Sequence, residues 1–244
     1  MLERGLMNQN FGLLKLKRDL SGHLVTYVRT DLNPKIIDGI VPVTSIINRS
    51  AEYPILECEG GVSFLETGSG APSVLTALYE CSTFPIASIV RVGACGGLNG
   101  VEVGQLVLVE SSLCMDAVSK KLCKTRVVGS DGSLVSDFSQ KLSSAGFDCV
   151  VGSCASINSM YMFEADIEKA RRMGATCWDL ETATVLAFGK RFRIPAAAVL
   201  YTVSNGGDNP DYPPLPHTEF VKAVVRVLRA TRRKNRRNRV ESEF

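Results

Sequence analysis

Short apolar runs alternate along the chain with breaks rich in glycine, proline, serine and asparagine. Apolar runs bounded by such turn residues are typical of strands, and apolar positions that recur every three or four residues are typical of helices. Strands are predicted at 23–29, 61–67, 86–92, 105–110, 149–156 and 196–203. Helices are predicted at 73–81, 134–145, 161–173, 181–191 and 219–231.

The order of these elements predicts the fold class. Apolar strands that alternate with helices indicate an α/β fold, with a central mixed, twisted β-sheet flanked by helices on both faces. The 244 residues fit one large domain. We therefore expect a single domain over residues 1–231, followed at 232–244 by a basic C-terminal tail that is flexible.

Ligands of such folds bind outside the carboxyl ends of the strands. Four segments rich in Gly, Ser, Asn or Asp are expected there as loops, at 30–35, 67–73, 93–98 and 204–208. The third follows Arg91, which ends an apolar run. A guanidinium beside glycine backbone suits an oxyanion, most often phosphate. The alternative is a structural ion pair of Arg91, with glycines that serve only the turn.

Charge and cysteine content indicate whether nucleic acid, a metal ion or disulfide bonds are to be expected. Residues 229–239 contain seven basic and no acidic residues. The whole chain has a net charge of only +3, so the rest of the chain is acidic overall. A basic tail can bind nucleic acid or a carrier, but a solvated terminus is favoured, and nucleic acid is not expected as a partner. Eight cysteines without a Cys-x-x-Cys pair and only two histidines argue against zinc and for reduced thiols.

The apolar runs are too short to cross a bilayer, and the first residues lack the pattern of a signal peptide. We therefore expect a cytoplasmic protein without a membrane partner.

Five segments, taken in order, resemble the nucleoside phosphorylase superfamily of uridine phosphorylases, hexameric purine nucleoside phosphorylases and methylthioadenosine nucleosidases. They are Thr-Gly-Ser-Gly-Ala-Pro-Ser at 67–73, Ile-Val-Arg-Val-Gly-Ala-Cys-Gly-Gly at 89–97, Val-Gly-Gln-Leu-Val-Leu-Val at 103–109, Trp-Asp-Leu-Glu-Thr-Ala-Thr at 178–184 and Thr-Val-Ser-Asn at 202–205. With looser matches, the resemblance runs from about residue 24 to residue 228. It implies a pentosyltransferase that cleaves the N-glycosidic bond of a nucleoside to free base and ribose 1-phosphate. Inorganic phosphate would be the co-substrate, with no cofactor and no metal, and uridine is favoured over purine nucleosides.

The resemblance also implies roles for individual residues, with Arg91, Glu181 and Asn205 as the catalytic groups. The phosphate-binding residues would be Arg91, Arg49, Lys35, Gly93 and Ala94. The ribose-binding residues would be Glu181, Leu180 and Met160. The base-binding residues would be Tyr161, Asn205, Asp179, Cys95 and Gly96. Arg49 would reach into a neighbouring subunit's site, which implies a homodimer or a trimer of dimers.

Three positions depart from the family pattern and keep other functions open. Lys35 stands where the family has arginine, Ala94 where it has serine or threonine, and Asp179 where it has glutamate. The alternatives are a purine nucleoside phosphorylase, a nucleosidase that uses water in place of phosphate, and a nucleoside-binding or oligomer-partner protein without catalysis. Two residue-level alternatives remain as well: Glu181 as an acid favoured by a helix dipole, and Met160 with Tyr161 as core residues.

Overall fold

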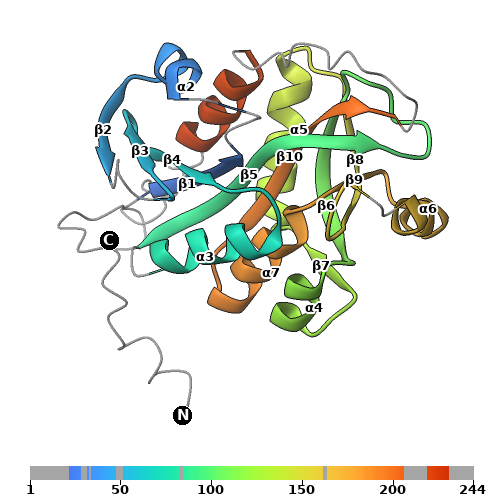
Figure 1. Cartoon of the computed structure of the whole chain (residues 1–244). Helices are drawn as coiled ribbons and strands as arrows, with labels where there is room; N and C mark the ends of the chain where they lie inside the picture. The colour runs from blue at the N-terminus through green and yellow to red at the C-terminus, as the bar shows by residue number, and fades with distance from the viewer. Residues whose placement is uncertain are drawn as a thin grey trace, which may run out of the picture.

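A mixed β-sheet forms the centre of the structure (Figure 1). The computed structural model describes residues 22–28, 32, 34–47, 52–82, 85–161, 164–205 and 219–230. Within these residues the strands are β1 Gly22–Val28, β2 Val43–Ile47, β3 Ile55–Cys58, β4 Val62–Thr67, β5 Ile86–Gly97, β6 Leu106–Cys114, β7 Val127–Gly129, β8 Cys149–Ser156, β9 Cys177–Asp179 and β10 Ala196–Ser204.

The long strand β5 lies at the junction of two parts of the sheet. On one side β5 pairs in parallel with β1 and β1 with β4, and antiparallel β3 and β2 complete that edge. On the other side β5 pairs with both β10 and β9. β10 also pairs with β6, β6 with β8, and β8 with β9. The strands β5, β10, β6, β8 and β9 therefore close into a ring. Side chains of β5 alternate between two faces, and only those that point into this ring are surrounded by strands.

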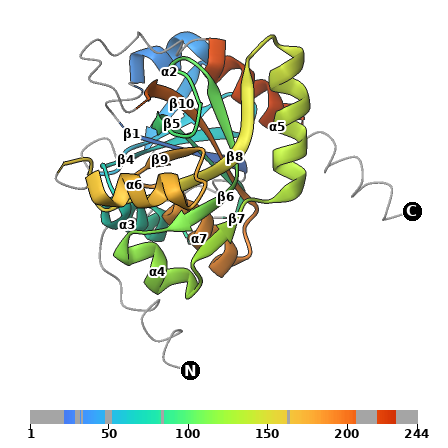
Figure 2. The ribbon, with the colours of Figure 1, turned by 90° about the vertical axis from the view of Figure 1, so that its right-hand side faces the viewer.

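Helices cover both faces of the sheet (Figures 1 and 2). On one face lie α3, α4 and α7, and on the other lie α2, α5 and the helical segment 219–230; α6 lies at one end. Their bounds are α2 Pro34–Ile40, α3 Ala71–Cys81, α4 Ala117–Cys123, α5 Gly132–Ser144, α6 Glu164–Arg172 and α7 Thr182–Phe192. A separate hydrophobic core lies on each face. The expected α/β fold is confirmed.

The main difference from the sequence prediction concerns the segment after Val92. A loop was expected at 93–98, and this is wrong, because β5 continues to Gly97 and pairs with β10 and β9. Gly93, Gly96 and Gly97 have no positive φ. They leave room above the strand: an added Cβ on Gly93 would meet the Arg91 guanidinium, and one on Gly96 would meet the Trp178 indole. These glycines serve close approach of side chains rather than a turn.

The sequence prediction also missed the short elements α2, α4, β2, β3, β7 and β9. Each has seven residues or fewer, so none carries enough periods for its pattern to stand out. Half of the expected loop at 30–35 lies outside the described residues, and Lys35 belongs to α2. The proposed tail at 232–244 lies outside them as well. In the described part of the chain, no helix is long and apolar enough to cross a membrane.

The packing of α5 gives a first prediction. Phe138 is fully buried in the core on the α5 side, whereas Gln140 on the same helix is exposed. Phe138→Ala should lower the free energy of unfolding by about 3–5 kcal/mol, because it leaves a cavity. Gln140→Ala, the control, should change it by less than about 0.5 kcal/mol. Urea denaturation measures both values, and similar losses would contradict this assignment of the buried face.

Candidate functional site

The Arg91 side chain is buried within the sheet, with a relative exposure of 1%. Its backbone lies in β5, between Thr26 of β1 and Ala198 of β10. The guanidinium extends over Gly93, where an added Cβ would lie only 2.7 Å from Nη2. Since Gly93 is two residues farther along the strand, this carries the positive charge toward the carboxyl end of β5.

Two carboxylates contact this guanidinium. Arg91 Nε donates to Asp179 Oδ2 at 3.2 Å, and Nη2 donates to Glu181 Oε2 at 2.6 Å. All three side chains are almost completely buried, which makes these ion pairs far less screened than pairs on the surface. The structural ion pair considered as the alternative for Arg91 is therefore present, and both partners come from the Trp-Asp-Leu-Glu segment.

Glu181 joins the beginnings of two helices. It is the N-cap residue of α7, although its side chain does not cap that helix. Instead Oε1 accepts a hydrogen bond at 2.7 Å from the backbone N–H of Gly70, the N-cap residue of α3. Gly70 has a φ of +85°, a conformation that favours glycine. The 67–73 loop and Glu181 thus meet at Arg91, as expected for segments at the carboxyl ends of the strands.

The Asp179 carboxylate accepts hydrogen bonds from five donors of this chain. Besides Arg91 Nε they are Ser156 Oγ at 2.7 Å, Thr182 Oγ1 at 2.6 Å, Thr182 N at 3.0 Å and Cys154 Sγ at 3.4 Å. Burial raises the pKa of the Cys154 thiol to about 12, so this thiol is protonated and donates. Asp179 therefore connects the end of β8, the start of α7 and Arg91. Its expected contact with a base stays a prediction.

The other predicted residues on β5 and β9 surround this cluster. Cys95 is buried, with its Sγ 3.6 Å from Thr202 Oγ1. Ala94 packs on the opposite face, against the core on the α2 and α5 side. Gly96 pairs with Trp178, and Leu180, beside Glu181, is half-buried.

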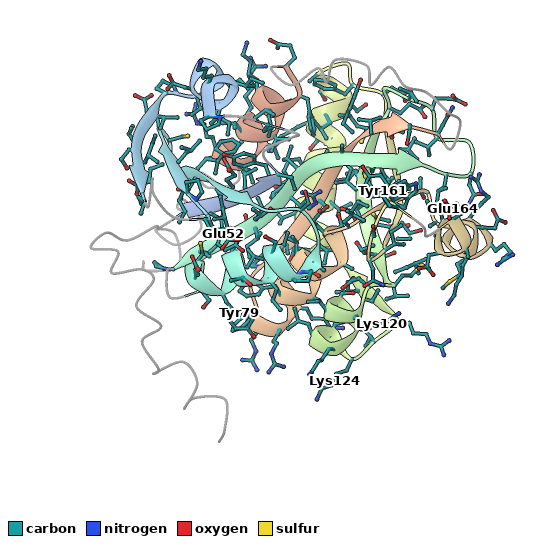
Figure 3. The ribbon with its side chains drawn as sticks, viewed as in Figure 1. Glu52, Tyr79, Lys120, Lys124, Tyr161 and Glu164 are labelled. Atoms are coloured by element: carbon teal, nitrogen blue, oxygen red, sulfur yellow. The ribbon has the colours of Figure 1, made fainter. Side chains whose placement is uncertain are left out.

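Four of the remaining predicted residues lie on the surface. Lys35 is exposed in the first turn of α2, and Asn205 is exposed with its Nδ2 3.4 Å from Glu102 Oε2. Met160 and Tyr161 follow β8 with relative exposures of 45% and 75%, which contradicts a core role for the pair. Figure 3 shows Tyr161 near Glu164 on the α6 side of the molecule. Arg49 lies outside the described residues.

Sequence reasoning missed three side chains that belong to this arrangement. Ser156 and Thr182 donate to Asp179, and the Ser156 Oγ also accepts from the backbone N–H of Ala183. Trp178 lies against Gly96. Two signals were available: Ser156 ends a predicted strand, and Trp178 is the only tryptophan of the chain. Among the residues that the structure describes, no group of three or more His, Cys, Asp or Glu side chains could hold a metal ion.

Comparison with known proteins agrees with this fold. A purine nucleoside phosphorylase of the DeoD type from Bacillus velezensis is 25% identical over 152 residues, which cover 59% of this chain and 63% of the relative. The chain thus matches less than two thirds of that relative's length.

Two solved structures are similar in fold. The AMP nucleosidase from Bacteroides thetaiotaomicron has a TM-score of 0.75 at 18% identity, over 90% of this chain and 93% of that chain. A uridine phosphorylase from Vibrio fischeri has a TM-score of 0.73 at 19% identity, over 88% and 94%.

The sequence model of the phosphorylase superfamily matches residues 41–233, which is most of the chain. This match includes β2 to β10 and the residues of the Arg91 cluster, and it confirms the resemblance seen in the sequence. The chain belongs to the phosphorylase superfamily.

Proposed function

We propose that this protein cleaves the N-glycosidic bond of a nucleoside with inorganic phosphate, and releases free base and ribose 1-phosphate. Uridine-type nucleosides are the proposed substrates. The observation that carries the proposal is the direct contact of Arg91 with Glu181, beside the Gly70 N–H. This places a guanidinium, a carboxylate and a helix N-terminus within hydrogen-bond reach of one another. Phosphorolysis of a nucleoside needs these groups, for an anion and for a sugar.

In the proposed reaction Arg91 binds phosphate and Glu181 holds the ribose hydroxyls. As the bond from C1′ to the base breaks, positive charge develops on the ribose ring. The Glu181 carboxylate and the bound phosphate stabilise that charge, in a site already excluded from water. Phosphate attacks C1′, so the bond to the base is replaced by a bond to a phosphate oxygen. No covalent intermediate with the protein is needed.

The two carboxylates have different parts in this proposal. Asp179 is held by Ser156 and by the start of α7, so it keeps its contact with Arg91 Nε. Glu181 exchanges its contact with Arg91 for the ribose, which makes Nη2 available to phosphate. The pair that stays, Arg91 with Asp179, is neutral, and the negative charge of Glu181 is then directed at the ribose rather than at the phosphate.

Asn205 supports a pyrimidine rather than a purine as the base. It follows β10, at the carboxyl end of a strand that pairs with β5. Its neutral amide can donate a hydrogen bond to a carbonyl oxygen, but it cannot donate a proton to a purine nitrogen. A uracil ring has two such carbonyl oxygens, and they carry the charge of the departing base.

Hydrolysis is the second candidate, and one observation favours it. Two buried carboxylates contact the guanidinium of Arg91. If Glu181 keeps its contact with Arg91, Nη2 stays occupied and a phosphate has to displace this carboxylate. Such a cluster disfavours an anion and leaves water as the nucleophile.

A panel of uridine, thymidine, inosine and adenosine, each with and without phosphate, tests the proposal. We expect release of uracil and ribose 1-phosphate from uridine only when phosphate is present. Release of free ribose at an unchanged rate without phosphate would establish hydrolysis instead. Preference for inosine or adenosine would contradict the assigned base. Binding of a nucleoside in calorimetry with no turnover would contradict catalysis.

The role of Glu181 gives a second test. Glu181→Gln keeps the shape of the side chain, but it removes the negative charge and replaces one of the two oxygens that accept from Gly70 N–H and Arg91 Nη2 with an NH₂ group. We expect kcat/KM for the nucleoside to fall by about 100-fold, a typical effect of losing one transition-state electrostatic contact. Glu168→Gln, an exposed carboxylate on α6, is the matched control and should leave kcat/KM unchanged. Equal activity of both variants would remove Glu181 from the mechanism.

Asp179 gives a third test, of stability. Asp179→Asn introduces an NH₂ group where donors already surround the side chain, and it leaves Arg91 with one carboxylate fewer. Breaking a buried ion pair in this way should lower the free energy of unfolding by about 3–5 kcal/mol. Asp148→Asn is the control: the exposed Asp148 accepts from Gln105, and it should cost less than about 1 kcal/mol. Urea denaturation compares the variants; a loss no larger than the control's would mean that Asp179 does not hold the cluster.

Assembly as a homodimer or a trimer of dimers stays a prediction. It rests on Arg49, whose expected role is to complete the site of a neighbouring subunit. Analytical ultracentrifugation gives the oligomeric state directly.

A further inference from the structure

Two cysteines outside the Arg91 cluster lie next to each other. Cys114 is the last residue of β6 and is 4% exposed, and Cys123 is the last residue of α4 and is half-buried. Their Sγ atoms are 3.3 Å apart. A disulfide bond is about 2.05 Å long, so the two sulfurs need to approach by little more than 1 Å.

The backbone holds both cysteines at this distance. The Cys114 N–H donates to Arg126 O at 2.9 Å, which fastens the end of β6 to the segment after α4. In its thiol form, Cys123 Sγ donates to Ser119 O at 3.0 Å, one turn earlier in the helix. At the other end of α4, the Asp116 side chain accepts from Ser119 N at 2.7 Å. The sulfur contact therefore lies between two elements that are both anchored.

The two thiols differ in their chemistry. Burial raises the pKa of Cys114 to about 12, so this thiol stays protonated. Burial also acts to raise the pKa of Cys123, but hydrogen bonds with Thr125 and Cys114 outweigh it and leave this pKa below its ordinary value. Four exposed basic residues lie within three positions of Cys123 in the sequence: Lys120, Lys121, Lys124 and Arg126. Figure 3 labels Lys120 on α4 and Lys124 directly after this helix. The lowered pKa of Cys123 favours its thiolate, which is the reactive form of a cysteine.

Other cysteines make a contrast. Cys154 and Cys177 also contact each other, but both are completely buried, and burial raises the pKa of both. An oxidant in solution cannot reach them. Cys149 is half-buried like Cys123, yet burial raises its pKa to about 11. Cys123 combines partial exposure, a lowered pKa and a second sulfur at contact distance.

We propose that Cys114 and Cys123 form a site of reversible oxidation, at which hydrogen peroxide converts the two thiols into an intramolecular disulfide. The Cys123 thiolate attacks the peroxide, the O–O bond breaks, and a sulfenic acid forms as the first water leaves. The Cys114 thiol then attacks Cys123 Sγ, the S–O bond breaks, and the second water leaves. Two thiols lose two electrons and two protons, and one peroxide is reduced to two waters. A dithiol reductant reverses the reaction.

Peptide mapping of the native protein tests this proposal. The reduced chain is treated with hydrogen peroxide, blocked with iodoacetamide and digested with trypsin. Trypsin cleaves after Lys120 and Lys121, between the two cysteines, so a disulfide keeps the two peptides together. We expect one linked species that contains Cys114 and Cys123 and separates on treatment with dithiothreitol. In the reduced protein, iodoacetamide should react with Cys123 about tenfold faster than with Cys149.

Three variants complete the test. Cys114→Ser should stop the reaction at a sulfenic acid on Cys123, which dimedone traps. Cys123→Ser should give neither the linked species nor a sulfenic acid on Cys114. Cys149→Ser, the matched control, should form the linked species as the native protein does. The proposal is overturned if peroxide leaves both thiols free, oxidises Cys123 without linking it to Cys114, or links other cysteines equally well.

Discussion

The buried guanidinium of Arg91 is the constraint on which the rest of the site depends. A charge inside a closed ring of strands is stable only if opposite charges and hydrogen bonds surround it. Asp179 and Glu181 supply those charges from a segment that is far away in sequence. The short strand β9 and the first turn of α7 must therefore meet β5 in one register, because an ion pair leaves little freedom in distance.

This constraint also fixes the starts of two helices. Asp179 accepts from the N–H and hydroxyl of Thr182, and Glu181 accepts from the N–H of Gly70. Each carboxylate thus satisfies a backbone donor at a helix N-terminus as well as Arg91. The glycine at position 93 belongs to the same arrangement, since only the absence of a Cβ lets the guanidinium extend along the strand.

The sequence alone predicted the long elements, and it assigned two residues to one candidate site that the structure brings into contact. The strand at 149–156 and the helix at 134–145 were correct within a few residues, because each carries several periods of its pattern. Arg91 and Glu181 were both expected at the site from motifs. Their mutual contact was not expected, because it depends on the register of β9 against β5. The same limit explains the glycines after Arg91: composition suggested a turn, whereas pairing across the sheet decides that they are strand.

The hydrogen bonds of Asp179 and Glu181 decide which of these two carboxylates can move to contact a ligand. Asp179 holds Ser156, Thr182 and Arg91 at once, so moving it would leave several buried donors unsatisfied. Glu181 lies next to the 67–73 loop. If the Glu181 carboxylate moves, the Gly70 N–H can donate to the ligand group that takes its place. A ligand that offers hydroxyls to Glu181 and negative charge to Arg91 would satisfy both partners of the broken pair. A ribose together with a phosphate offers this combination, whereas a neutral nucleoside with water offers only the first part. The pairing of Arg91 with two unequal carboxylates is therefore compatible with phosphorolysis, provided that it is Glu181 that moves.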